Sequence, residues 1–272
     1  RGKKQMIQQV LQIAINKGMI SPLVFLIIVL VVILATLFAT RRGMYTPKLR
    51  KLPALDAIEE AIGRATEMGR PIVFGQGLGG LADEYAAQTV AGLSVLGYTA
   101  EVAAKYGARL IYCVYDPSTQ PLAYEIVQQA HVRAGHPETF NPDNIIFLAA
   151  DQFPWAFGVV GIVQREKAAA AIYMGAFWAE SLILAETGYY AGAIQIAGTA
   201  NRHQIQFFVA ACDYSLIGEE LLAAGAYLSK DPTQIGSIWG QDIGRIISVL
   251  VLIVGAIIFW AGITALKDFL AT

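Results

Sequence analysis

Charged side chains are scarce in this sequence of 272 residues, since Asp, Glu, Lys and Arg make up 15% of it. Ordinary soluble domains contain roughly 25%. Two charge-free runs account for much of the deficit: 23 residues between Lys17 and Arg41, and 21 residues between Arg245 and Lys267. At about 1.5 Å per residue, a helix through either run can cross a hydrocarbon core of about 30 Å. These runs predict membrane-spanning helices over residues 19–40 and 244–268.

A secretory signal peptide is the alternative for the first run. The apolar stretch is too long for one, and Arg41 and Arg42 follow it where a small-residue cleavage site is needed. We therefore expect a permanent anchor, with an amphipathic segment over residues 1–18 before it and a basic linker over residues 41–52 after it.

Cysteine is also rare, and basic residues are unevenly placed. Cys113 and Cys212 both lie in apolar, strand-like runs, so two buried thiols in a reducing compartment fit at least as well as one disulfide. Six basic residues flank the central region and five lie outside the two runs, which slightly favours a cytoplasmic central domain. We expect a multi-pass protein of the cell membrane. The six are Arg41, Arg42, Lys48, Arg50, Lys51 and Arg245; the five are Arg1, Lys3, Lys4, Lys17 and Lys267.

Several signatures of catalysis are missing. The chain has neither a Gly-x-Ser-x-Gly elbow nor a P-loop lysine. Its three histidines, His131, His136 and His203, show no metal-binding spacing. Residues 52–243 hold nine Lys and Arg against 20 Asp and Glu, a net charge of −11, which argues against nucleic-acid binding. We predict no catalytic residue, no metal ligand and no nucleic-acid partner.

What the central region does contain is short apolar strands alternating with helices. Strands are predicted over residues 71–74, 110–115, 145–149, 193–197 and 205–212, and helices over 53–68, from 83, 121–134, 166–186 and 216–228. The pattern predicts an α/β domain over residues 53–243, Rossmann-like, with a mostly parallel sheet.

One joint does not fit that pattern. Only seven residues separate the predicted strands 193–197 and 205–212, too few for a helical crossover. Either these strands pair antiparallel or residues 204–212 are helical, and both alternatives stay open.

Ligands of such sheets bind at the carboxyl ends of the strands. There we expect Gly75, Gly77, Gly80, Asp116, Thr199 and Asp213, forming a crevice for a small-molecule ligand.

The sharpest signal is Gly75-x-Gly77-x-x-Gly80, which follows a strand and precedes a helix, as in phosphate-binding turns. The acidic residue expected about 20 positions later is absent, so a plain tight turn is the alternative and no cofactor is identified. For Asp213 the alternatives are a contact with the ligand and a cap for the helix predicted from residue 216. For Glu180 they are an acid/base group and a buried structural hydrogen bond.

The segment 51–71, KLPALDAIEEAIGRATEMGRP, resembles a family of prokaryotic membrane proteins known only as a domain of unknown function. Three later stretches carry the same likeness: GAFWAESL at 175–182, AIQIAGT at 193–199 and FFVAACDYSLIGEEL at 207–221. The resemblance covers most of residues 51–243 and the flanking anchors, and implies a membrane-anchored Rossmann-like core. It implies no activity, and the glycine-rich turn of that family is not a strict dinucleotide fingerprint.

Two functions are therefore expected. The first is a non-enzymatic assembly subunit, bound to the bilayer, that self-associates or joins a larger membrane complex. Its charge-poor domain would supply the interface, because interface cores are depleted in charge, with residues 168–190 as the leading candidate. The alternative is a membrane-tethered nucleotide- or dinucleotide-binding protein or enzyme that uses the crevice.

Overall fold

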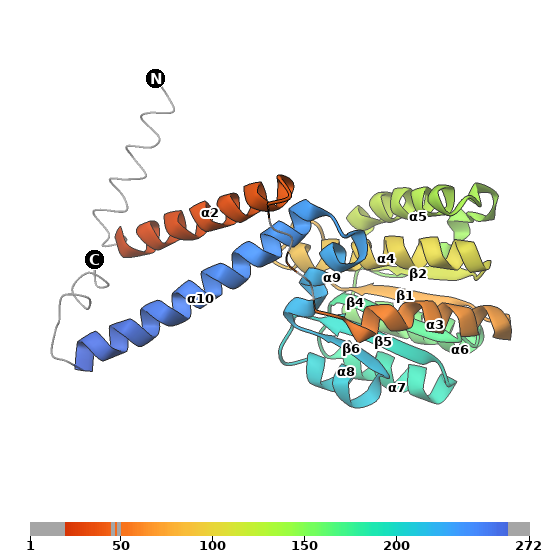
Figure 1. Ribbon diagram of the computed structural model, residues 1–272. Helices are drawn as coiled ribbons and strands as arrows, with labels where there is room; N and C mark the ends of the chain where they lie inside the picture. The colour runs from red at the N-terminus through yellow and green to blue at the C-terminus, as the bar shows by residue number, and fades with distance from the viewer. Residues whose placement is uncertain (1–19, 45–46, 48–49, 261–272) are drawn as a thin grey trace, which may run out of the picture. The chain divides into compact units, whose positions relative to one another are not determined.

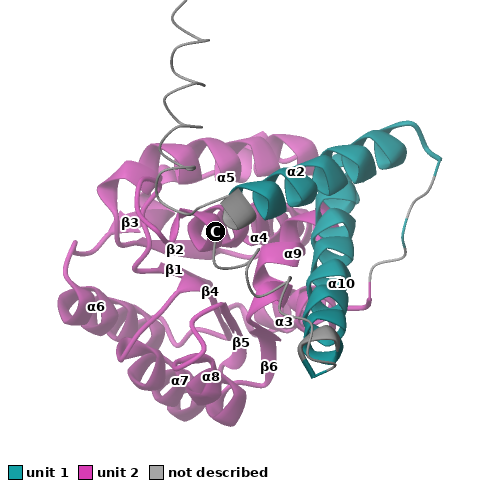
Figure 2. Ribbon diagram, turned by 90° about the vertical axis from the view of Figure 1, so that its left-hand side faces the viewer, with its two compact units in different colours: residues 1–49, 230–272 teal, residues 50–229 magenta. Residues whose placement is uncertain are grey.

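The computed structural model describes residues 20–44, 47 and 50–260. The chain divides into two compact units, drawn in different colours in Figure 2. One unit is the continuous stretch Arg50–Ser229, and the other combines residues 1–49 with residues 230–272. Each unit is described by itself below.

The unit Arg50–Ser229 is built around a sheet of six parallel strands in the order β3-β2-β1-β4-β5-β6. This is the strand order of dinucleotide-binding Rossmann folds. The predicted Rossmann-like α/β fold is confirmed. The strands are β1 (Ile72–Gly77), β2 (Leu110–Val114), β3 (Ile145–Phe147), β4 (Ala170–Ala176), β5 (Ile194–Thr199) and β6 (Tyr214–Ile217).

Helices cover both faces of the sheet (Figure 1). One face carries α3 (Pro53–Met68), α4 (Ala86–Tyr106), α5 (Gln120–Ala134) and α9 (Glu219–Ser229), which we call the charged layer. The other carries α6 (Gln152–Arg165), α7 (Glu180–Ala191) and α8 (Ile205–Ala211), the charge-poor layer. Short 3-10 helices occupy Pro117–Thr119, Pro137–Thr139 and Pro142–Asn144.

Strand residues alternate between two cores. Phe74 and Tyr112 point toward the charged layer, whereas Val73 and Ile111 point toward the charge-poor layer, and all four are buried. Strands β1, β2 and β4 are buried along their whole length, as expected of a parallel sheet covered on both faces.

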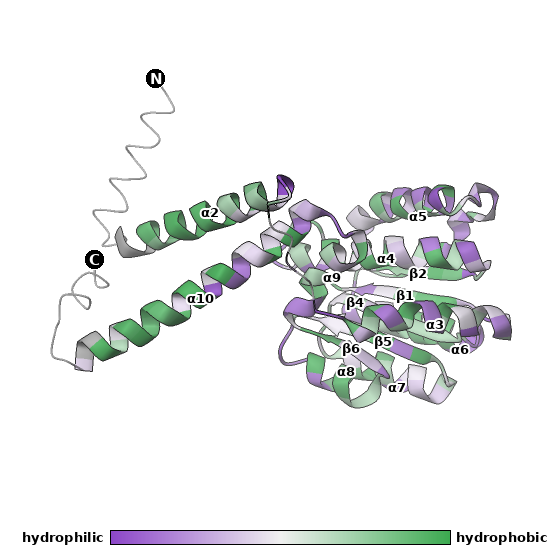
Figure 3. Ribbon diagram, in the orientation of Figure 1, coloured by the Kyte–Doolittle hydropathy of each residue, from purple (hydrophilic) through white to green (hydrophobic). Residues whose placement is uncertain are grey.

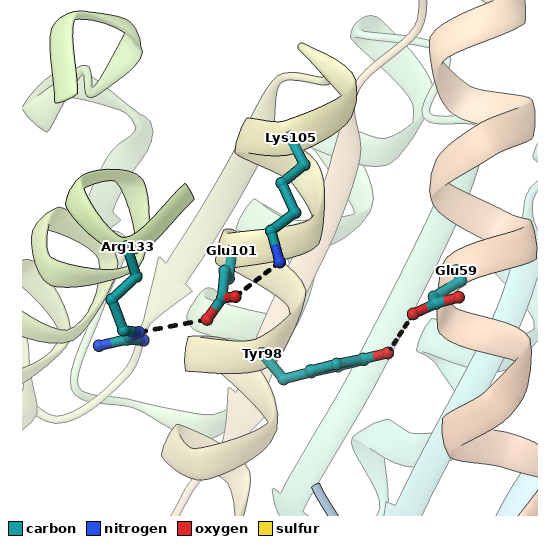
Figure 4. A network of polar contacts seen from close by, with 5 residues as sticks. All are labelled: Glu59, Tyr98, Glu101, Lys105 and Arg133. Carbon is teal, nitrogen blue, oxygen red and sulfur yellow. Dashed lines mark hydrogen bonds and ion pairs between the residues drawn. The ribbon is translucent and has the colours of Figure 1, made fainter. Parts of the chain in front are cut away.

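The helices of the charged layer are joined by polar contacts on their outer surface (Figure 4). The Tyr98 hydroxyl of α4 donates to a Glu59 carboxylate oxygen of α3 at 2.7 Å. Glu101 of α4 accepts from Lys105 at 2.7 Å and from Arg133 of α5 at 3.2 Å. These contacts fix the spacing of α3, α4 and α5.

The helix predicted over residues 166–186 is wrong except for residues 180–186, which form the first part of α7 (Glu180–Ala191). Helix α6 ends at Arg165, and the alanine-rich run that follows forms β4. This strand lies between β1 and β5, where small buried side chains on both faces let the helices pack closely. Helix propensity is a weak preference that such tertiary contacts override.

The predicted strand over residues 205–212 is also wrong, and the helical alternative is correct. These residues form α8, which returns the chain to the starting edge, so that β6 pairs parallel to β5. The helix predicted from residue 216 begins at Glu219, because β6 extends to Ile217.

In its described residues, the second unit contains two helices that pack side by side, α2 (Ile20–Arg41) and α10 (Pro232–Trp260). Both are long and apolar enough to cross a membrane (Figure 3), and 11% of the apolar stretch of each is buried. Helix α10 begins 12 residues before the span expected at 244–268, so residues 232–243 are helical extension here rather than part of the domain. The segments expected at 1–18 and beyond 260 lie outside the described residues.

Candidate functional site

The glycine-rich turn lies where the strand order reverses, at the carboxyl ends of β1 and β4. Gly77 has a φ of 77°, and a Cβ there would overlap the Ala176 carbonyl oxygen. Gly175 faces it with a φ of 148°, and a Cβ there would overlap the Gln76 carbonyl oxygen. The Leu78 N–H donates to Ala176 O at 2.7 Å. The two strand ends are therefore held together where a dinucleotide crevice normally opens.

The third glycine of the motif lies against carboxylates. The Gly80 N–H donates to Asp83 Oδ2 at 2.6 Å, and the Tyr85 N–H donates to Asp83 Oδ1 at 2.8 Å. A Cβ at Gly80 would overlap Asp116 Oδ2, while Asp116 Oδ1 accepts the Ser118 N–H at 2.8 Å. Backbone N–H groups of this kind bind phosphate in nucleotide sites. Here the side chains of Asp83 and Asp116 take them.

Thr199 belongs to a closed hydrogen-bond network at the end of β5. Its hydroxyl donates to Gln88 Oε1 of α4 at 3.3 Å, and the Ala200 N–H donates to the same oxygen at 2.8 Å. Gln88 Nε2 donates to Asn201 Oδ1 at 3.1 Å, and Asn201 Nδ2 donates to Phe177 O at 2.6 Å. These polar atoms link α4 to the ends of β4 and β5.

Glu180, at the start of α7, is fully buried. Its Oε1 accepts the Trp178 N–H at 2.9 Å, and its Oε2 accepts Gln152 Nε2 at 2.5 Å. Burial raises the pKa of this carboxyl, although the two hydrogen bonds act in the opposite direction. The arrangement matches the structural alternative for Glu180, a carboxylate that joins the start of α7 to the start of α6.

The carboxyl edge of the sheet is negatively charged. Burial raises the pKa of Tyr115, and the neighbouring carboxylates raise it further. These carboxylates lie at or just before helix N-termini, where they complement the helix dipole, just as bases occupy the last turns of α4, α5 and α6. These carboxylates would repel a further anionic group such as a phosphate. The carboxylates around Tyr115 are Asp151, Asp116, Glu180 and Asp83.

Asp213 does not join the other predicted residues. It precedes β6, and its Oδ2 accepts the Gln195 N–H at the start of β5, at 2.8 Å. It therefore lies at the amino edge of the sheet and caps no helix at residue 216, because the residues before it form α8 rather than a strand. The structure brings Gly77, Gly80 and Asp116 together, connects Thr199 to them through α4, and separates Asp213.

Two glutamines at this edge, Gln76 and Gln88, were not among the site residues expected from the sequence. Gln76 is fully buried, and its Nε2 donates to Thr119 Oγ1 at 3.0 Å, beneath the glycine-rich turn. A signal was present, since a glutamine inside the apolar strand Ile72–Gly77 needs a buried partner. The partner itself cannot be read from the sequence.

Other chemistry is limited in the described part of the chain. No group of three or more His, Cys, Asp or Glu side chains is arranged to hold a metal ion among residues 20–44, 47 and 50–260. Cys113 and Cys212 are free thiols, and burial raises the pKa of each to about 12, which makes them poor nucleophiles.

One pocket lies at the opposite, amino edge of the sheet, with a volume of about 290 Å³. It opens between α5 and the segment that leads to β3. His131 contributes its ring, whose Nδ1 lies 2.8 Å from Val127 O, and Phe140 packs edge-on against that ring. Arg109 stands at the same pocket but already contacts Asn144 and Glu166. The pocket is therefore formed around groups that satisfy one another.

No curated protein and no solved structure matches the chain. A family model described as "Domain of unknown function (DUF6754)" matches residues 11–270, which include both long apolar helices and the whole α/β domain. The chain belongs to that family.

Proposed function

We propose that this protein is a non-enzymatic, membrane-anchored assembly subunit. Its α2 and α10 helices cross the bilayer, its α/β domain lies in the cytoplasm, and its charge-poor layer binds another copy or a larger membrane complex. The observation that carries the proposal is the apolar outer surface of α6 and α8. In the same domain, Asp83 and Asp116 accept hydrogen bonds from backbone N–H groups at the predicted ligand crevice.

Anchorage is supported by the exposure of the two long helices. A core helix of a soluble protein would be mostly buried, whereas these expose large apolar side chains along their length, such as Leu26, Leu34 and Leu252. Lipid is the solvent that suits such a surface. Because residues 42–231 connect the end of α2 to the start of α10, two crossings place the domain on one side of the membrane. Arg41 and Arg42 at that boundary favour the cytoplasmic side.

Assembly is supported by the exposed face of α6. Phe153 and Phe157 lie one turn apart with ring centroids 6.5 Å apart, and the Phe157 side chain is 59% exposed. Helix α6 has no charged residue before Arg165, so its outer face is as apolar as its inner one. A helix that is apolar all round is normally covered. Phe207 of α8 and Phe147 at the end of β3 are exposed as well.

The test is the mass of the full chain, in detergent and in lipid nanodiscs, at micromolar concentration. We expect a defined oligomer or, in extracts of the native membrane, a defined complex. Phe157→Asp should weaken association by about tenfold or more, because it buries a charge in an apolar interface. The matched control is Val132→Asp on α5. Val132 is 51% exposed on the charged layer, so this substitution should leave the mass unchanged.

A monomeric wild-type chain in both detergent and nanodiscs, with no complex in the native membrane, would overturn the proposal. So would a Phe157→Asp variant with wild-type mass. Circular dichroism and the thermal midpoint of each variant show whether the domain remains folded.

The strand order favours a second candidate, a membrane-tethered nucleotide- or dinucleotide-binding protein. The ligand would lie over Gly75, Gly77 and Gly80, near Asp116 and Thr199. Thermal-shift measurements of the full chain with nucleotides and dinucleotides test it. A shift that Asp116→Asn increases would support binding, since the variant removes a charge that repels phosphate. No shift for any compound, with or without that substitution, would dismiss it.

A further inference from the structure

Helices α2 and α10 pack through pairs of small residues, four positions apart on each helix. A Cβ at Gly236 would overlap Thr40 Oγ1, and Gly240 lies in the same way against Thr36. Both threonines are buried, and their hydroxyls donate to backbone carbonyls one turn earlier in α2. The helices therefore run antiparallel in a fixed register, with residue 240 level with residue 36 and residue 236 level with residue 40.

The tryptophans of α10 independently mark the two surfaces of a bilayer. Trp239 and Trp260 are 21 residues apart, which corresponds to about 32 Å along a helix and matches a hydrocarbon core of about 30 Å. Tryptophan is enriched at both interfaces of membrane proteins. In the register above, Trp239 is level with Leu37, just before Arg41 ends the charge-free run of α2. Both observations place one membrane boundary at Trp239.

This boundary puts an ion pair inside the bilayer. Asp242 and Arg245 follow Trp239 by three and six residues, or about 4.5 and 9 Å. Their Oδ1 and Nη1 atoms are 3.7 Å apart, and the side chains are 59% and 54% exposed. The span expected from the sequence began at residue 244 and therefore excluded Asp242.

The pair faces away from α2. Asp242 and Arg245 lie about 200° and 140° around the helix from Gly240, which contacts α2. Val249, Leu252 and Ala256 continue the same exposed face. The resulting spacing of three and four residues is that of a helix seam that packs against another helix. Ionisable residues within membrane helices almost always face another protein group or water rather than lipid.

We infer that this face of α10 binds the α10 helix of a second copy. Asp242 of each copy pairs there with Arg245 of the other. The inference rests on the proposed membrane-anchored assembly and names one of its contacts. One acid and one base per copy make the face self-complementary under a two-fold axis. At 3.7 Å the contact between Asp242 and Arg245 within one chain is longer than a hydrogen bond. Both side chains tilt toward the helix N-terminus and hence toward the headgroups, which lowers the cost of burying them.

Charge exchange between copies tests this contact. The full chain is reconstituted in lipid vesicles as donor- and acceptor-labelled populations, and association is measured by energy transfer. Asp242→Arg alone and Arg245→Asp alone should each weaken self-association by about tenfold, because like charges then meet. An equimolar mixture of the two variants should associate within about threefold of wild type, since each unlike pair is restored between copies but not within one.

A mixture that associates no better than the single variants would overturn the inference. The neutral double variant Asp242→Asn with Arg245→Gln keeps the helix easy to insert and should also associate about tenfold more weakly; wild-type association would count against the contact. As a matched control, the same exchange at Glu101 and Arg133 in the charged layer should leave energy transfer unchanged.

Failure of this contact and failure of the proposed function give different results. If wild type associates, and Phe157→Asp weakens association while the charge exchange has no effect, assembly stands and the α10 contact is wrong. If wild type stays monomeric in vesicles, the α10 contact between copies is wrong. If it also forms no complex in the native membrane, or is extracted from vesicles by alkaline carbonate, the proposed function itself fails.

Discussion

The two helical layers cover the same sheet but present different surfaces to the outside. Among the ion pairs of the described domain, the pair that joins two helices, Glu101 of α4 with Arg133 of α5, lies in the charged layer. The charge-poor layer has three charged residues in its three helices, Arg165, Glu180 and Glu186, and Glu180 is buried. All exposed phenylalanines of the described domain lie in α6, α8 or β3: Phe147, Phe153, Phe157 and Phe207.

The difference concerns the outer surface and not the packing against the sheet. Beneath the charge-poor layer, Tyr173 and Phe208 stack with ring centroids 6.2 Å apart, and Phe177 meets Phe208 edge-on at 5.1 Å. Together with Trp155 of α6, which packs against Phe177, these rings attach α6 and α8 to the sheet. An apolar outer surface suits an interface, whereas exposed charged side chains suit water.

The largest expected effect tests whether the charge-poor layer is as integral to the fold as the charged one. Trp155 of α6 is fully buried and packs against Tyr115 and Phe177. Trp155→Ala should lower the free energy of unfolding by about 3–5 kcal/mol, because it leaves a cavity. Chemical denaturation of the full chain in detergent, followed by circular dichroism, measures the loss. Phe157→Ala on the exposed side of the same helix should change stability by less than about 0.5 kcal/mol. Similar effects of the two substitutions would show that α6 is only loosely attached.

Loss of the hydroxyl should change the stability in opposite directions for two tyrosines, one from each side of the sheet. The Tyr98 hydroxyl in the charged layer donates to Glu59, so Tyr98→Phe should cost about 1 kcal/mol. Tyr173 is buried under the charge-poor layer, and its hydroxyl has no hydrogen-bond partner among the described residues. Tyr173→Phe removes an unsatisfied polar group and should raise stability by about 1 kcal/mol. Thermal midpoints of both variants measure the contrast, and a destabilised Tyr173→Phe would contradict it.

Much of this fold follows from the sequence, because alternating short apolar runs and helices specify a parallel sheet between helical layers. The errors lie where composition opposes position. Residues 168–171 are all alanine, a strong helix former, yet Ala170 and Ala171 begin β4, where they are buried between β1 and β5. The same error left residues 152–165 without a predicted element. Within the interface expected at residues 168–190, β4 is buried, whereas Tyr189 and Tyr190 of α7 are exposed.

The candidate site was less predictable, because the arrangement of its residues depends on distances between segments that are remote in sequence. The glycines at 75, 77 and 80 correctly indicate a tight turn after β1. The sequence does not reveal that Gly77 and Gly175 let two strand ends approach closely, or that Asp83 and Asp116 reach the backbone N–H groups. Asp213 was misplaced for a simpler reason: one wrongly assigned strand transfers a residue to the opposite edge of a parallel sheet.

Glu180 gives the charge-poor layer a distinctive dependence on pH. Burial raises its pKa above the ordinary value of 4.5, so the folded state holds the proton more tightly than the unfolded state does. Its contribution to stability is therefore greatest below about pH 4.5 and declines as the pH rises through the raised pKa. Glu180→Gln keeps an acceptor for the Trp178 N–H and does not titrate. Its thermal midpoint relative to wild type should rise between pH 4.5 and pH 7, and a constant difference would refute this account.

Glu101 provides the opposite case in the charged layer, with the smallest expected effect. Its hydrogen bond from Lys105, followed by the one from Arg133, lowers its pKa below the ordinary 4.5. The folded state therefore gains stability from the ionised carboxylate above about pH 4.5 and loses it as the pH falls through the lowered pKa. Glu101→Gln should cost about 0.5 kcal/mol at pH 7, and the cost should shrink in acid and in 1 M salt, because the pair is partly exposed to solvent. Thermal midpoints across pH and salt measure both trends. If Glu101→Gln and Glu180→Gln changed stability in the same direction with pH, the two layers would not differ electrostatically in the way their contacts indicate.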